Sequence, residues 1–124
     1  MLPTRHRLTE RRDFATTIRG RGARRQGSSL LVVHARVADA TQTDARGDDS
    51  PRVGLVVSTA VGNAVTRTRV KRRLRAQVAP LLADLPPGTD VVIRANPAAA
   101  DAESHELGAA LRHCLRSVLV ERAR

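Results

Sequence analysis

A short segment near the middle of the chain, residues 67–75, most constrains how this sequence can fold, because most of its residues are positively charged. Apolar residues still recur through and beyond it at helical spacing, so Val70, Leu74, Val78 and Leu81 would form one stripe on a helix. The cations fall mostly opposite this stripe or flank it: Arg67, Arg69, Lys71, Arg72, Arg73 and Arg75. We therefore predict a helix that buries one side and exposes a dense cationic face.

The start of this helix also carries information about what the helix binds. Gly62 and Asn63 are typical of a turn, and Asn63 is a candidate N-cap. Cations in the first turns oppose the helix dipole and repel one another. This local cost, together with the charge density, favours RNA or DNA as a partner over the alternative of a solvated charged face.

The composition supports a folded domain with a polyanionic partner. The chain has 124 residues, which suits one domain, 1–124, and its net charge is +10 with a sequence pI of about 11.7. A disordered chain is disfavoured because 41% of the residues are hydrophobic and occur in periodic segments. Nearly all the cations are arginines, with Lys71 as the one lysine. Arginine binds phosphate bidentately and stacks on bases, although a GC-rich coding bias would give the same preference.

Several functional classes are disfavoured by what the sequence lacks. Phe14 is the one aromatic residue, so base-stacking platforms of the RRM or OB type are not expected. Cys114 is the single cysteine, which leaves no internal disulfide and no thiol metal cluster. No apolar run is long enough to span a membrane, and the basic residues 1–12 lack the apolar core of a secretory signal.

No constellation of residues in the sequence resembles a complete active site. The histidines are scattered and lack the spacing of zinc ligands: His6, His34, His105 and His113. Phosphate-binding glycine loops of the Walker or dinucleotide type are also missing. We therefore predict a protein that binds RNA or DNA, with no catalytic residues and no metal site of its own, so that any chemistry belongs to a partner.

The order of elements is predicted from periodicity and turn residues. A basic arm, 1–8, precedes a helix at about 9–19, in which Phe14 and Ile18 share a face. Ile18 is expected in the core, whereas Phe14 fits either the core or contact with a nucleotide. Strands are predicted at 29–38, 52–58 and 90–95, with a further short strand possible at 23–28.

The remaining segments complete an αββαβα order. Residues 39–51 are acidic and are predicted to form a flexible loop, for which a solvated loop is favoured over a metal site. Pro80 is expected to end the cationic helix near Ala79, and residues 81–85 add one more turn. A last helix is expected from 101 or 104 to 120, with an apolar face that includes Leu107, Leu111 and Leu115.

Two sequence blocks resemble a known family. RVGLVVS at 52–58, followed by GNAVTRTRVKR at 62–72, is similar to the protein subunit of bacterial ribonuclease P, whose second block typically reads Gly-Asn-Ala-Val-x-Arg-Asn-Arg-x-Lys-Arg. Weaker matches flank these blocks at Arg7-Leu8, Asp13-Phe14, Arg94 and Pro97, so the resemblance covers roughly residues 5–118. Thr68 departs from the family asparagine, and Thr59 and Ala60 stand where many members carry lysines.

The resemblance implies a fold and a function. The fold is a single α+β domain, a two-layer α/β sandwich of three helices on a mostly antiparallel four-stranded sheet, with a left-handed βαβ crossover and a likeness to a ribosomal protein domain. The function is to bind a catalytic RNA and the 5′ leader of precursor tRNA. The enzyme then removes the leader endonucleolytically, and Mg²⁺ is held by the RNA and the substrate rather than by the protein. A monomeric, cytoplasmic protein is expected.

The resemblance also assigns residues to two surfaces. The catalytic RNA would be met by Arg67, Thr68, Arg69, Lys71, Arg72 and Arg75. The leader would lie in a cleft between sheet and helix, where Phe14 and Val33 map, although Val33 stands at a position that is often tyrosine. Two alternatives remain: a ribosome-associated RNA-binding protein of similar fold without processing activity, and a stand-alone protein nuclease, which the missing acid cluster disfavours.

Overall fold

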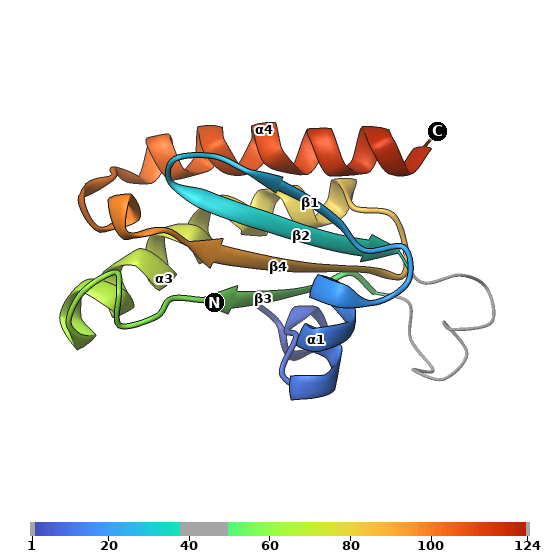
Figure 1. Cartoon of the computed structure of the whole chain (residues 1–124), viewed down its shortest axis with the longest axis horizontal. Helices are drawn as coiled ribbons and strands as arrows, with labels where there is room; N and C mark the ends of the chain where they lie inside the picture. Colours follow the sequence, from blue (N-terminus) through green and yellow to red (C-terminus); the bar gives the residue numbers. More distant parts are fainter. Residues whose placement is uncertain (1, 38–49, 124) are drawn as a thin grey trace.

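The computed structural model describes residues 2–37 and 50–123, so the predicted acidic loop lies almost wholly outside the described residues. A four-stranded sheet has α3 and α4 packed on one face, while α1 lies on the opposite face (Figure 1). The helices are α1 (Arg11–Arg19), α3 (Ala64–Val78) and α4 (Ser104–Ala123). None of the helices in these ranges combines the length and the apolar character needed to cross a membrane.

The strands pair in the order β1-β2-β4-β3, which makes the sheet mixed. They are β1 (Arg24–Gly27), β2 (Leu31–Val37), β3 (Arg52–Val56) and β4 (Thr89–Ala95). The β1–β2 and β2–β4 pairs are antiparallel, whereas β3 and β4 are parallel neighbours joined through α3. The α+β architecture with a mostly antiparallel sheet is therefore confirmed, while the left-handed sense of the crossover stays a prediction.

The two faces of the sheet have different roles because side chains alternate along each strand. Leu31, Val33 and Ala35 of β2, with Val91 and Ile93 of β4, face α3 and α4 in the hydrophobic core. The intervening residues, which include Val32, His34, Val92 and Arg94, face the side on which α1 lies. The α1 side of the sheet is thus partly covered and carries polar groups.

The cationic helix forms as the sequence predicts. Asn63 caps α3, and its side-chain oxygen accepts a hydrogen bond from the backbone N–H of Thr66 at 2.9 Å. Val70, Leu74 and Val78 are fully buried, and α3 ends at Val78, where a 3-10 helix, η2 (Ala79–Asp84), takes in Pro80. Burial of this stripe anchors a helix whose own charges disfavour it.

The N-terminal arm differs from the exposed, extended segment that was predicted. A short 3-10 helix, η1 (Thr4–His6), precedes a parallel bridge between Arg7 and Val53 at the β3 edge. Leu2 and Leu8 are buried, although Arg5 and Arg7 are exposed as expected. The arm therefore packs against the domain, because its two leucines supply apolar surface. The surrounding basic residues led to the prediction of an exposed segment.

Element boundaries differ from the predictions by a few residues. The short strand at 23–28 is present as β1, and β2 begins at Leu31 because the Ser28 side chain accepts hydrogen bonds from the N–H groups of Leu30 and Leu31. A further 3-10 helix, η3 (Pro97–Asp101), leads to α4. The α4 start at Ser104 fits the second of the two predicted starts.

We expect the α3 stripe, and not the exposed side of the helix, to carry its contribution to stability. Leu74→Ala should lower the free energy of unfolding by about 2–5 kcal/mol because it leaves a cavity in the core. Val65 is 74% exposed on the same helix, so Val65→Ala should change stability by less than about 0.5 kcal/mol. Urea unfolding followed by circular dichroism measures both, and equal losses would contradict this account of the helix.

Candidate nucleic-acid interface

The polar residues of α3 point in three directions, and the first group faces outward. Thr68 and Arg72 are exposed, and with Val65 and Ala64 they line a shallow hollow of about 370 Å³. Arg69 forms one wall of this hollow. An exposed guanidinium beside a hydroxyl and a small apolar surface suits contact with a phosphodiester backbone.

A second group on α3 faces the segment before α4. Arg69 Nη2 donates a hydrogen bond to the carbonyl oxygen of Ala100 at 3.1 Å, and Arg73 Nη1 donates to the carbonyl oxygen of Ala102 at 2.6 Å. One turn further, Gln77 Nε2 donates to Ser104 Oγ at 2.9 Å. This edge of α3 therefore fastens η3 and the start of α4, so Arg69, which was predicted to contact RNA, also has a structural contact.

The third group on α3 faces the β3 edge of the sheet. Lys71 and Arg75 are half-buried, and they line a hollow of about 290 Å³ together with Phe14, Leu8 and Gly54. The structure thus brings two residues predicted for the catalytic RNA next to a residue predicted for the leader. Arg67 is half-buried, and its Nε has no hydrogen-bond partner within the described part of the chain.

Phe14 combines features of its two predicted roles, a core residue and a contact for a nucleotide. The residue is half-buried, and its ring lies directly over Gly54, where a Cβ atom would overlap ring atoms Cε1 and Cζ. Leu8 packs beside it in the same hollow. Part of the ring is therefore held by the fold, while the rest remains accessible at the cleft.

Val33 does not lie at the cleft. Its side chain is 0% exposed and belongs to the hydrophobic core, where its strand neighbours are Gln26 and Ile93. The structure therefore argues against direct contact between Val33 and a leader. The adjacent residues Val32 and His34 point to the α1 side instead, and the sequence signal for this is the pair of polar residues at 34 and 36, which alternate with apolar residues at 33, 35 and 37.

His34 belongs to a polar cluster on the α1 side of the sheet that sequence reasoning did not single out. His34 is 3% exposed, its Nε2 lies 3.5 Å from Arg94 Nη2, and its Nδ1 has no hydrogen-bond partner in residues 2–37 and 50–123. Burial lowers the pKa of His34 below its ordinary value, and the nearby charges of Arg94 and Arg25 lower it further. The histidine is therefore neutral at pH 7 beside two arginines, both of which are exposed.

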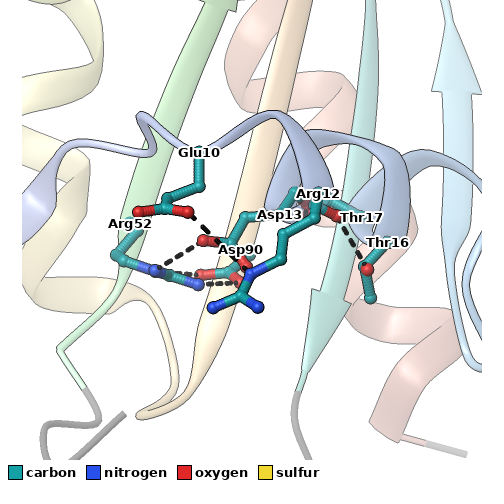
Figure 2. A network of polar contacts seen from close by, with 7 residues as sticks. All are labelled: Glu10, Arg12, Asp13, Thr16, Thr17, Arg52 and Asp90. Carbon is teal, nitrogen blue, oxygen red and sulfur yellow. Dashed lines mark hydrogen bonds and ion pairs between the residues drawn. The ribbon is translucent and has the colours of Figure 1, made fainter.

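A polar network ties α1 to the sheet next to the cleft. Arg52 binds Asp90 with two hydrogen bonds, from Nε at 2.9 Å and from Nη2 at 2.7 Å, and its Nη1 reaches Asp13 at 3.2 Å (Figure 2). The hydrogen bond with Asp90 is the main reason that the pKa of Arg52 is raised, and burial opposes this effect. Both carboxylates are thus engaged by the Arg52 guanidinium. The described residues contain no group of three or more metal-binding side chains.

Comparison with known proteins gives a consistent result. A family model described as Ribonuclease P matches residues 2–119. The chain is 53% identical to the ribonuclease P protein component of Streptomyces griseus over 121 residues, which cover 96% of each chain. It is also 53% identical over 113 residues to that of Rhodococcus opacus, covering 90% of this chain and 87% of the relative.

Solved structures show the same fold. An RNase P protein mutant of Staphylococcus aureus, described as having defective mRNA degradation activity, superposes with a TM-score of 0.74. The match covers 90% of this chain and 86% of the other at 23% sequence identity. The fold of the described residues is therefore shared with proteins whose sequences have diverged widely.

We expect the arginines that contact η3 to differ from the outward arginine in their effect on stability. Arg69→Ala and Arg73→Ala each remove a charged donor from a backbone carbonyl, which should lower the free energy of unfolding by about 1.5–3 kcal/mol. Arg72→Ala, the matched control on the exposed side, should change it by less than about 0.5 kcal/mol. Chemical denaturation of the RNA-free protein makes this comparison, and three equal values would rule out the structural contacts.

His34 should make the protein less stable in mild acid. The pKa of His34 is lowered in the folded state, so below about pH 6.5 the unfolded chain takes up a proton that the folded chain does not. The contribution of neutral His34 to the free energy of unfolding is therefore fully present above this pH, and it falls as the pH drops towards the pKa of the folded state. Thermal melts between pH 7.5 and 5 should show a smaller loss for His34→Gln than for the unmodified chain, and an equal loss in both would contradict this account.

Proposed function

The chain belongs to the ribonuclease P protein family, and we propose that it binds the catalytic RNA of ribonuclease P through α3 and the 5′ leader of precursor tRNA through the cleft at Phe14. It is the protein component of a tRNA-processing ribonucleoprotein. The observation that carries the proposal is that outward-facing and cleft-facing groups lie on different sides of the same cationic helix. One small domain thus offers two RNA-binding surfaces.

The outward surface suits a folded RNA. Thr68 and Arg72 are exposed beside Val65, and Arg69 reaches the same hollow from the η3 edge. Arginines held on a helix present their donors in fixed positions, which matches the fixed phosphates of a structured RNA. Thr68 replaces a two-pronged amide with a hydroxyl, so it supplies a single donor there.

The cleft surface suits a single strand. Phe14 supplies an aromatic face on which a base can stack, and Lys71 and Arg75 supply cations for its backbone in the same hollow. Arg94 adds an exposed guanidinium on the α1 side of the sheet. Stacking and charge of this kind are tolerant of sequence, which suits leaders that vary between precursor tRNAs.

The chemistry is proposed to lie with the RNA. Mg²⁺ would be held by the catalytic RNA and the substrate. In support of this, the carboxylates of Asp13 and Asp90 already form ion pairs with the guanidinium of Arg52. The contribution of this chain is to bind and orient the precursor. A monomeric protein that acts in the cytoplasm completes the proposal.

Reconstitution tests the two surfaces together. The protein is combined with ribonuclease P RNA from the same organism, and cleavage of precursor tRNA is measured at low Mg²⁺, with RNA-free protein as the control. We expect cleavage by the complex and none by the protein alone. Cleavage by rigorously RNA-free protein would contradict the assignment of the chemistry to the RNA.

Two variants should separate the surfaces. Arg72→Ala should weaken assembly with the catalytic RNA. It should also reduce the slope of the logarithm of the binding constant against the logarithm of the salt concentration by about 1. Phe14→Ala should leave assembly with the catalytic RNA unchanged but weaken the binding of precursor tRNA relative to the binding of mature tRNA. Arg112→Ala changes an exposed arginine of α4 and serves as the matched charge control. Equal weakening of precursor and mature tRNA by Phe14→Ala would contradict the leader contact.

A further inference from the structure

The Arg52 network joins three elements that meet beside the cleft. Arg52 is the first residue of β3, Asp90 lies opposite it on the parallel neighbour β4, and Asp13 lies in the first turn of α1. The side chains are only 18%, 14% and 25% exposed, respectively, so solvent screens their interaction weakly. The network therefore fixes the start of α1 relative to the sheet.

Phe14 is placed by this network and by the backbone beneath it. It follows Asp13 directly in α1, and the N–H groups of both residues donate to the carbonyl oxygen of Glu10, at 3.0 and 3.2 Å. The ring lies where a side chain at residue 54 would be, so the absence of a Cβ at Gly54 is what allows its close approach. A small rotation of α1 would move the ring away from the hollow that it shares with Lys71 and Arg75.

We propose that Asp13, Arg52 and Gly54 are positioning residues for leader recognition, which hold the Phe14 ring in the cleft without contacting RNA themselves. The inference rests on the proposed function, in which Phe14 contacts the leader. Arg52 acts through Asp13 on the turn that carries Phe14, and Gly54 acts by leaving space for the ring. The Arg52–Asp90 pair joins neighbouring strands and supplies the fixed end of this arrangement.

Within the network of Asp13, Arg52 and Asp90, a substitution of Asp13 affects the contact with α1 and leaves the Arg52–Asp90 ion pair between β3 and β4 in place. Asp13→Asn keeps the size of the side chain and removes its charge, while both hydrogen bonds between Arg52 and Asp90 remain. Removing a negative charge by itself strengthens binding to a polyanion. Loss of positioning has the opposite sign, so the direction of the change distinguishes a positioning effect from a general electrostatic one.

The test uses the reconstituted complex of the full chain with the catalytic RNA. For Asp13→Asn, we expect the affinity for precursor tRNA relative to mature tRNA to fall by about fivefold or more, which corresponds to weakened stacking of one base. Affinity for the catalytic RNA should not fall. Glu10→Gln is the matched control, because it makes the same charge change at an exposed site just before α1, and it should leave the ratio unchanged.

A double-mutant cycle separates action through Phe14 from a general structural effect. In a Phe14→Ala background, Asp13→Asn should cause no further loss of the precursor-to-mature ratio, because the ring that it positions is gone. Additive losses would overturn the positioning role. Gly54→Ala should lower the same ratio by displacing the ring, and it tests the geometry without altering the ion pair, which matters if Asp13→Asn reduces stability.

The outcomes also distinguish this inference from the function beneath it. If Phe14→Ala lowers the ratio while both Asp13→Asn and Gly54→Ala behave like Glu10→Gln, the positioning role is overturned and the leader contact stands. If Phe14→Ala leaves the ratio unchanged, the leader contact and the positioning role are both overturned. All variants are compared below their melting temperatures, which thermal melts determine.

Discussion

Burial of the Val70–Leu74–Val78 stripe is the interaction on which the rest of the structure depends. The cations of α3 repel one another and oppose the helix dipole, so the helix needs a compensating term from the core. Three fully buried apolar side chains and the Asn63 cap supply it. The same burial fixes the rotation of α3 about its axis, and this rotation decides which cations reach solvent, which reach the cleft and which reach η3.

The sequence predicts this helix well because the signals are local. Helical spacing, the cap and the proline that ends the segment all lie within a few turns, and the structure agrees with each. The contacts of Arg69 and Arg73 were not predictable in the same way, because their acceptors are backbone carbonyls about thirty residues later in the chain. A helical wheel shows the direction of a side chain relative to the stripe but not what another segment places there.

The placement of Val33 away from the cleft has a related cause. Val33 and His34 are neighbours in β2, and a shift of one residue exchanges a core side chain for one on the α1 side. Motif resemblance located the strand but not the direction of its side chains, which follows from the place of Leu31, Val33 and Ala35 in the core cluster and from the polar residues at 34 and 36. The buried leucines of the N-terminal arm were missed because a run of basic residues suggests exposure, while Leu2 and Leu8 alone decide its packing.

The pairing of β3 with β4 links the fold to the function. Parallel pairing places Arg52 beside Asp90, and this brings a guanidinium to the edge where α1 and the N-terminal arm meet. Residues 13, 52 and 90 are far apart in the sequence, so no local pattern predicts their contact. The parallel arrangement also requires a crossover, and α3 is that crossover. The crossover helix α3 is therefore also the element that carries the cations. Phe14 lies beside α3 because the sheet holds α1 next to the β3 edge.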